Sequence, residues 1–141
     1  MRTIADVLAR LGARTAYVVH GADGIDELSP AGPNLVAEVR EGDVREFELD
    51  PLELGVERCD PDELRGGTPE ENAQAIREAF AGAGGGRRDA ILLTAAGAIA
   101  AGGGAADLRE GLAAAREAID SGGAAARLDE LIAFSRAEVH A

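Results

Sequence analysis

The sequence predicts an α/β fold, with a partial, mainly parallel sheet that carries a β-hairpin and is flanked by helices. Two short apolar runs, residues 16–19 and 90–93, are long enough for buried strands and too short for helices. Residues 36–40 and 44–49 alternate apolar with polar side chains around a short turn, as the strands of a hairpin do. At 141 residues, the chain is long enough for a single α/β domain, residues 1–141, and too short for two.

The first segment, residues 3–11, predicts a short amphipathic helix that leads directly into the strand at residues 16–19. Gly12 follows it as a stop signal. A loop rich in proline and glycine precedes the hairpin, which should bury one face and expose the other. Two Asp-Pro pairs then act as structural punctuation, and Asp60 can cap a helical turn that begins at Pro61.

Thr68 and Glu71 have the spacing of a capping box, so a helix should begin at Pro69 and end near residue 81. A run rich in glycine, residues 82–86, follows this helix. Such a run could cradle a phosphate, but it lacks the GxGxxG and P-loop spacings. A flexible connection is therefore the favoured interpretation.

The second predicted strand, residues 90–93, should pass directly into an alanine-rich helix over residues 94–101, whose small side chains allow close packing. A glycine run ends that helix, and Asp107 can cap the next one. Residues 121–123 separate it from the last helix. Because this turn is so short, the last two helices should be antiparallel.

The formal net charge is −12, and all 14 basic residues are arginine. So acidic a chain disfavours nucleic acid, because such binding needs basic side chains that release counterions. Cys59 is the single cysteine, so it forms no intrachain disulfide or zinc cluster, and we expect a buried or idle thiol. The sequence lacks a membrane-spanning run and a signal-peptide pattern. It therefore predicts a cytoplasmic protein without nucleic-acid or membrane partners.

The candidate site begins where the first predicted strand ends, in the run His20-Gly21-Ala22-Asp23-Gly24-Ile25-Asp26-Glu27. Gly21 and Gly24 allow φ > 0, so the chain can turn sharply at the carboxyl end of a strand, where ligands of open α/β sheets bind. Asp23, Asp26 and Glu27 would repel one another unless a cation or protons offset their charge. Their oxygens suit Mg²⁺ held together with a substrate's phosphates. The alternative is ordinary turn chemistry in an acidic protein.

The same run resembles the HGxDGxDE stretch of anthranilate phosphoribosyltransferases, the enzymes of tryptophan biosynthesis that join anthranilate to phosphoribosyl pyrophosphate. Other segments occur in the family's order and at similar spacing, namely residues 8–12, Gly32-Pro33, Gly66-Gly67 with Glu71-Asn72-Ala73, residues 88–93 and residues 118–122. The resemblance covers nearly the whole chain but only the C-terminal part of the family's catalytic subunit. It implies a fold like the C-terminal part of the nucleoside phosphorylase/phosphoribosyltransferase catalytic domain.

The resemblance also implies a magnesium-dependent reaction in which the amino group of anthranilate displaces pyrophosphate from phosphoribosyl pyrophosphate. Asp26 and Glu27 match the family's magnesium-binding pair, and no catalytic residue is assigned in this chain. For Asp23, an Asx-turn that shapes the loop is favoured over metal ligation. His20 could act as a general base, but an aromatic amine needs little deprotonation, so a positioning or structural role is favoured.

Several parts of the family's site lie upstream of the matched region. They are the glycine motif GTGGD, a lysine-containing loop and an anthranilate-contacting arginine, and these 141 residues offer no substitute. The substrate-binding residues are therefore expected upstream, as is the N-terminal helical region through which the family forms homodimers. Within the matched region, Asn34 and Thr94 stand where the family more often has Thr and Asn.

Two interpretations follow from these observations. In the first, the chain is the C-terminal portion of a phosphoribosyltransferase, truncated or started at an internal Met, and inactive without the missing part. In the second, it is a free-standing, non-catalytic module that uses the acidic loop to bind a divalent ion or a protein.

Overall fold

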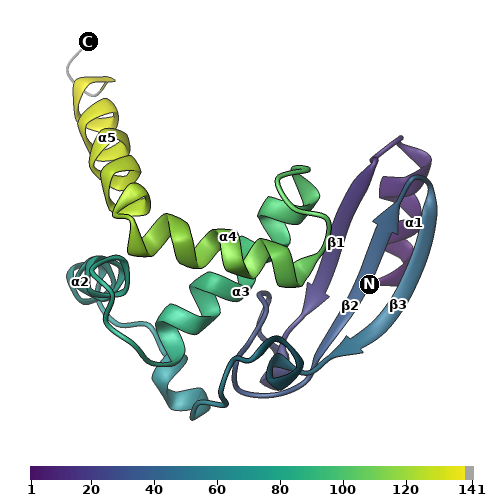
Figure 1. The fold of residues 1–141 in the computed structure, drawn as a ribbon, viewed down its shortest axis with the longest axis horizontal. Helices are drawn as coiled ribbons and strands as arrows, with labels where there is room; N and C mark the ends of the chain where they lie inside the picture. The colour runs from purple at the N-terminus through teal and green to yellow at the C-terminus, as the bar shows by residue number, and fades with distance from the viewer. Residues whose placement is uncertain (139–141) are drawn as a thin grey trace.

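The computed structural model describes residues 1–138, apart from the side chains of Asp23 and Glu138. His140, to which the sequence assigns no role, lies outside the described residues. The helices and strands are α1 (Arg2–Arg10), β1 (Thr15–His20), β2 (Asn34–Arg40), β3 (Asp43–Leu49), α2 (Pro69–Phe80), α3 (Gly86–Ala101), α4 (Leu108–Asp120) and α5 (Gly123–Glu138). Short 3₁₀ helices lie in the loops at Ala22–Gly24, Pro51–Leu54 and Pro61–Leu64. The sheet and α1 form one end of the molecule, α2 and α5 form the other, and α3 and α4 join them (Figure 1).

The sheet has three strands in the order β1-β2-β3, and both neighbouring pairs are antiparallel. The predicted hairpin is confirmed, with Val39 opposite Val44 and with Glu41 and Gly42 at positive φ in the turn. The prediction of a mainly parallel sheet is wrong for residues 1–138. A parallel pair needs a crossover connection, usually a helix, whereas the loop between β1 and β2 contains only one short 3₁₀ turn and folds straight back.

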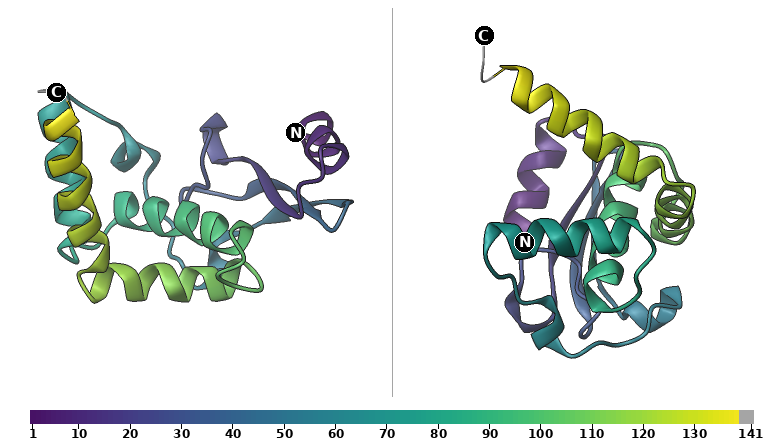
Figure 2. Two further views of the ribbon diagram at one scale, coloured as in Figure 1. Left: turned by 90° about the horizontal axis from the view of Figure 1, so that it is seen from above. Right: turned by 90° about the vertical axis from the view of Figure 1, so that its left-hand side faces the viewer.

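Helices cover both faces of the sheet (Figure 2). On one face, Ala5 of α1 packs against Ala37 and Val39 of β2. Successive side chains of a strand point to opposite faces, so Val36 belongs to the other face. There the sheet meets α3 and α4 in a core that comprises Leu28, Val36, Leu49, Val56, Leu92, Leu93, Ala96, Leu108, Leu112, Ala115 and Ile119.

Residues 90–93, predicted as a second strand, belong instead to the helix α3. Leu92, Leu93, Ala96 and Ala100 are at most 4% exposed, and their spacing follows one face of a helix. Periodicity cannot distinguish a four-residue apolar strand from a buried helical segment, and Ala and Leu both favour helices. The alanine-rich helix predicted for residues 94–101 is confirmed as the second half of α3.

Small residues bring α3 and α4 close together. A Cβ on Gly111 of α4 would lie 2.4 Å from the carbonyl oxygen of Ala96 on α3. The prediction that small side chains allow close packing is therefore confirmed.

Asp107 caps α4 as predicted, because its Oδ1 accepts a hydrogen bond from the N–H of Glu110 at 2.9 Å.

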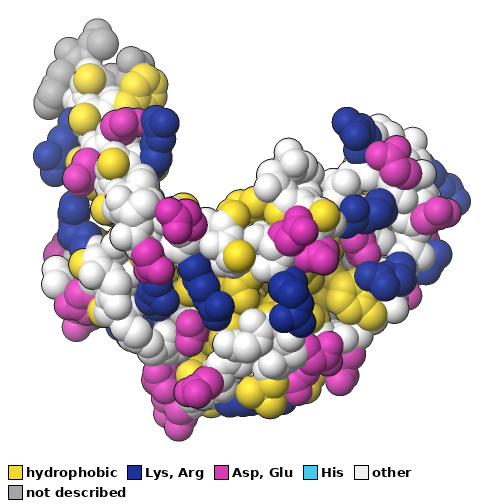
Figure 3. Space-filling model, in the orientation of Figure 1, with side chains coloured by type: hydrophobic (Ala, Val, Ile, Leu, Met, Phe, Trp, Pro, Cys, Tyr) yellow, Lys and Arg dark blue, Asp and Glu magenta, His cyan; other side chains and the backbone are white. Residues whose placement is uncertain are grey.

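The last helix, α5, projects from the body of the molecule (Figure 1). The prediction that it is antiparallel to α4 is wrong: α5 points away from α4 in Figure 1, because a short turn limits how far apart two helix ends lie but does not fix the angle between the helices. The right-hand view of Figure 2 shows α5 approaching α2 near one end and diverging from it toward the C-terminus, and Arg77 Nη1 of α2 is 3.6 Å from Asp129 Oδ1 of α5. Leu131 and Phe134 are 63% and 65% exposed, and hydrophobic side chains are visible on this projecting helix in Figure 3.

A nearly buried carboxylate links the strands. Glu38 of β2 is 8% exposed. It accepts hydrogen bonds from Tyr17 Oη at 3.2 Å, Arg40 Nε at 3.0 Å and Arg45 Nη2 at 2.9 Å. Burial alone would raise the pKa of the Glu38 carboxyl, but these hydrogen bonds outweigh it and hold the pKa below its usual value. Arg40 also donates to the carbonyl oxygen of Ala106, so the network reaches the loop between α3 and α4.

Across residues 1–138, the helices are too short or too polar to cross a membrane.

Candidate functional site

The loop after β1 folds back on itself within its first residues. The N–H of Gly21 donates to the carbonyl of Ile25 at 2.9 Å across the 3₁₀ turn Ala22–Gly24. Gly24 has the positive φ predicted for it, 83°, but Gly21 has a φ of −73°, which any residue can adopt. At Gly21 the requirement is space, since a Cβ there would lie 2.2 Å from the carbonyl oxygen of Glu27.

This loop places Asp26 and Glu27 on the wall of a cleft of about 460 Å³. Both side chains are exposed, and Thr94 Oγ1 on α3 donates a hydrogen bond to Glu27 Oε2 at 3.5 Å. Sequence reasoning missed this contact, because 67 residues separate its partners. His20 is exposed at the end of β1 and is not among the residues that line the cleft. The side chain of Asp23, predicted to form an Asx-turn, lies outside the described residues.

The cleft is also lined by Gly66 and by the first turns of α2 and α3. The predicted capping box of α2 is confirmed: the N–H of Thr68 donates to Glu71 Oε2 at 2.7 Å, and the N–H of Glu71 donates to Thr68 Oγ1 at 3.3 Å. The backbone hydrogen bond from Thr68 lowers the pKa of Glu71. Asn72 holds the loop before the helix, because its side-chain amide bonds both the N–H and the carbonyl of Gly67. Local hydrogen bonds therefore shape this edge of the cleft.

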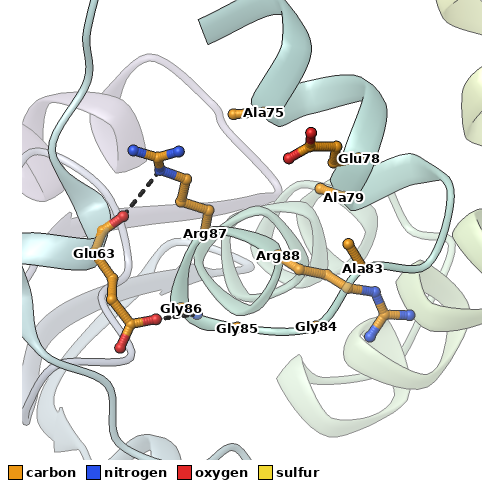
Figure 4. Close-up of a pocket in the computed structure, with 10 residues that line it drawn as sticks. All are labelled: Glu63, Ala75, Glu78, Ala79, Ala83, Gly84, Gly85, Gly86, Arg87 and Arg88. Atoms are coloured by element: carbon orange, nitrogen blue, oxygen red, sulfur yellow. Dashed lines mark hydrogen bonds between the residues drawn. The ribbon is translucent and has the colours of Figure 1, made fainter. Parts of the chain in front are cut away.

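Arg87, in the first turn of α3, reaches the same cleft. Its Nε donates to the carbonyl of Glu63 at 2.9 Å and its Nη2 donates to the carbonyl of Arg65 at 2.8 Å. Figure 4 shows the first of these bonds beside a neighbouring hollow of about 280 Å³. Arg88 points away from Arg87 in this view, and its Nη2 is paired with Asp120 at 2.7 Å. Two backbone carbonyls thus hold the Arg87 guanidinium in place.

The glycine run before α3 borders the hollow in Figure 4. Glu63 Oε2 accepts a hydrogen bond from the N–H of Gly86 at 3.1 Å, so a carboxylate already binds where a phosphate would have to sit. This contact favours the interpretation of residues 82–86 as a connection between helices over that of a phosphate-binding loop.

Nearby, burial and the carboxylates of Glu63 and Asp89 raise the pKa of Cys59. A raised pKa keeps the thiol protonated, in agreement with an idle cysteine.

The donor set fits a magnesium ion that shares its ligands with a substrate. Mg²⁺ usually takes one or two carboxylates and completes its shell with water and substrate phosphates. Asp26 and Glu27 supply such a pair on the cleft wall. Among the described side chains, no group of three or more His, Cys, Asp or Glu residues converges to form a complete protein cage.

Asn34 supports the loop in a way that the sequence did not reveal. It is 1% exposed, and its Oδ1 accepts a hydrogen bond from the N–H of Ser29 at 2.7 Å. Its Nδ2 lies 3.0, 3.1 and 3.3 Å from the carbonyl oxygens of Ser29, Gly32 and Leu49. These bonds fasten the end of the loop to β2 and β3. A buried side-chain amide that bonds the backbone groups of a loop produces no recognisable sequence pattern, so only the fold reveals it.

Comparison with known proteins gives a consistent result. The sequence model of a family described as "Glycosyl transferase family, a/b domain" matches residues 1–125. The anthranilate phosphoribosyltransferase of Azospirillum brasilense is 46% identical over 136 residues, which are 96% of this chain and 38% of that protein. The enzyme of the same name from Thermomicrobium roseum is 49% identical over 121 residues, which are 84% of this chain and 35% of that protein.

Solved structures show the same similarity. The anthranilate phosphoribosyltransferase of Thermus thermophilus matches 94% of this chain with a TM-score of 0.83 and 41% identity. The Saccharomyces cerevisiae enzyme in complex with PRPP and Mg matches 82% of it with a TM-score of 0.70 and 28% identity. The matched regions are 39% and 33% of those two chains. This chain therefore spans well under half the length of the relatives it matches.

Proposed function

The chain belongs to the glycosyl transferase family with an a/b domain, and from this premise we propose that it forms the C-terminal portion of an anthranilate phosphoribosyltransferase. The enzyme would transfer the phosphoribosyl group of phosphoribosyl pyrophosphate to the amino group of anthranilate and release pyrophosphate. Relatives with this name support the proposal, and so does the cleft that carries the carboxylate pair. The proposed cofactor is Mg²⁺, which is present in a similar yeast structure.

In this proposal, Asp26 and Glu27 hold the magnesium ion. When bound, the ion neutralises the charge that develops on the leaving pyrophosphate. Gly21 lets the backbone of Glu27 lie against the end of β1, and Thr94 orients the Glu27 carboxylate through its hydroxyl group. The acidic loop also suits the cationic character that the ribose carbon gains during transfer. The aromatic amine is already nucleophilic, so no side chain of this portion has to remove its proton before attack.

The remaining substrate contacts would come from the part of the enzyme that this chain does not span. Two surfaces support such a join. β1 lies at the edge of the sheet and carries no Asp, Glu, Lys or Arg, whereas the opposite edge strand β3 is rich in them. An uncharged edge strand readily pairs with another strand. Along α1, Ile4, Val7 and the C-cap residue Leu11 are 58%, 49% and 79% exposed at helical spacing. We expect the missing part to extend the sheet at β1 and to cover this stripe.

The observation that carries the proposal is the placement of Asp26 and Glu27 on the wall of the cleft, in a chain of this family. The test is a chimera that joins the upstream part of the Azospirillum brasilense relative to this chain. Its activity can be followed as the loss of anthranilate fluorescence in the presence of phosphoribosyl pyrophosphate and MgCl₂.

We expect magnesium-dependent turnover that falls roughly a hundredfold or more in the Asp26→Ala/Glu27→Ala variant, because transition-state charge is then unshielded. Asp43→Ala/Glu48→Ala, which removes two exposed carboxylates of β3, is the matched control and should retain full activity. A folded chimera without turnover would contradict the proposal. Turnover that survives the loss of Asp26 and Glu27 would contradict their assignment to the metal.

A further inference from the structure

Arg87 brings a positive charge into the cleft that carries Asp26 and Glu27. Among the described residues, the arginines that line this cleft are Arg65 and Arg87. Arg65 is neutralised, because its Nε lies 2.8 Å from Asp62 Oδ1. Arg87 instead bonds two backbone carbonyls and forms no salt bridge with a described side chain. The cleft therefore contains a carboxylate pair and one arginine that forms no salt bridge with a described carboxylate, although Glu71 is close enough for the charge of Arg87 to help lower its pKa.

The position of Arg87 in α3 makes this charge costly. Arg87 follows Gly86, the first residue of the helix, and a cation near a helix N-terminus is disfavoured by the helix dipole. The two carbonyl bonds fix the guanidinium and leave its other N–H groups available. A guanidinium presents these donors in a planar fork that matches phosphate oxygens. A fixed arginine beside a magnesium-binding pair suits an anion that also carries the metal.

We propose that Arg87 binds the pyrophosphate group of the substrate while Asp26 and Glu27 hold its magnesium ion. This inference rests on the proposed function and assigns a residue of this chain to the leaving group. Arg87 also borders the hollow of about 280 Å³ in Figure 4 and a further hollow of about 400 Å³. Carboxylates line both, Glu63 and Glu78 in the first and Asp62 and Glu71 in the other, and they would repel a phosphate. The cleft with the carboxylate pair is the side on which a metal ion can offset the repulsion.

The test is calorimetric titration of the full chain with sodium pyrophosphate in MgCl₂. The wild-type chain should bind magnesium pyrophosphate. Arg87→Gln should bind it about tenfold more weakly or worse, because it loses charge-assisted hydrogen bonds. Arg10→Gln makes the same change of charge at an exposed position on α1, away from the cleft, and should bind as the wild type does.

Arg87→Lys separates charge from structure, because lysine keeps the positive charge but cannot reach both carbonyls with a planar fork. Its affinity should lie between those of the wild type and Arg87→Gln, and circular dichroism should show all variants folded. If Arg87→Gln fails to fold, the lysine variant decides, and wild-type affinity there would overturn the inference. A folded wild-type chain that binds no magnesium pyrophosphate would overturn it too. So would a folded Arg87→Gln variant that binds within twofold of wild type, or an equal loss in Arg10→Gln.

The Asp26→Ala/Glu27→Ala variant distinguishes this inference from the proposed function. If it binds magnesium pyrophosphate normally while Arg87→Gln does not, the metal assignment fails and the role of Arg87 stands. If it loses binding while Arg87→Gln keeps it, the metal assignment stands and the role of Arg87 fails.

Discussion

Gly21 determines the position of Glu27 through the absence of a side chain. Its φ of −73° is ordinary, but a Cβ would lie 2.2 Å from the carbonyl oxygen of Glu27 and 2.6 Å from Cγ1 of Ile25. Rotation of a side chain cannot relieve the contact with a backbone atom. At the scale of single residues, the carboxylate loop therefore depends on one missing methyl group.

We expect Gly21→Ala to displace the loop and to lower the free energy of unfolding by about 1–3 kcal/mol, the usual cost of overpacking. Thermal unfolding measures the stability, and a magnesium titration reports on Asp26 and Glu27. Gly84→Ala is the matched control, because nothing lies within 4 Å of a Cβ there and its φ is not in the left-handed region. Equal effects of the two substitutions would contradict the steric explanation.

We expect Asn34→Ala to lower the free energy of unfolding by about 1–3 kcal/mol, because it leaves the buried N–H of Ser29 without its acceptor. Urea denaturation measures the loss. Asn72→Ala is the comparison, since Asn72 also holds a backbone turn but is exposed, and its replacement should cost less. A loss at Asn34 no greater than at Asn72 would show that burial does not matter here.

Single residues were predictable where their chemistry is local. Asp26 and Glu27 follow a short apolar strand and glycine turns, so their place in a loop after β1 could be predicted. Residue type alone could not distinguish a glycine that needs positive φ from Gly21, which needs space. The hydrogen bonds of Asn34 could not be predicted, because one of its partners, Leu49, lies 15 residues away.

At the scale of elements, the network around Glu38 joins all three strands. Tyr17 belongs to β1 and Arg45 to β3, and both bond the carboxylate on β2. Removing the nearly buried carboxylate of Glu38 would leave Tyr17, Arg40 and Arg45 without the acceptor that they share. This loss costs more than the loss of an exposed ion pair.

We expect the Glu38 network to make stability depend on pH. The folded state lowers the pKa of Glu38 from its ordinary value of 4.5. The contribution of the network is therefore fully present above that value and is lost as the pH falls through the folded pKa. Glu38→Gln should cost about 1.5–3 kcal/mol well above pH 4.5 and progressively less below it.

Urea unfolding of the wild type and Glu38→Gln at several pH values measures this dependence. Glu48→Gln, which changes an exposed glutamate of the same sheet, is the control and should show little difference from wild type. A stability difference between the wild type and Glu38→Gln that does not change with pH would contradict the assignment.

Elements with chemical end signals were predictable, whereas short apolar runs were ambiguous: residues 16–19 form a strand as predicted, but residues 90–93 do not. Thr68 and Asp107 cap helices as predicted, because a cap depends on a few neighbouring residues. Residues 90–93 were predicted as a strand but form part of α3. The prediction failed because a buried helix face and a buried strand both consist of apolar side chains. The angle between α4 and α5 could not be predicted, because the short turn between them does not determine it.

At the scale of the whole molecule, the chain is an α/β unit with an uncharged sheet edge and an exposed apolar stripe on α1. The α/β class could be predicted, but the direction of the strands could not, because it depends on how the loop after β1 folds back. The far parts of the cleft were also unpredictable. Gly66 and Arg87 are distant from Asp26 in sequence, and only tertiary packing brings them to one cleft.

The most direct measurement is isothermal titration of the folded chain with phosphoribosyl pyrophosphate, with and without MgCl₂, beside the Asp26→Ala/Glu27→Ala variant. We expect binding that requires magnesium and disappears in the double variant, because the cleft then lacks its metal ligands. Binding of equal strength in the double variant, or binding by the wild-type chain that does not require magnesium, would contradict the claim that these two carboxylates form the magnesium half of a phosphoribosyltransferase site.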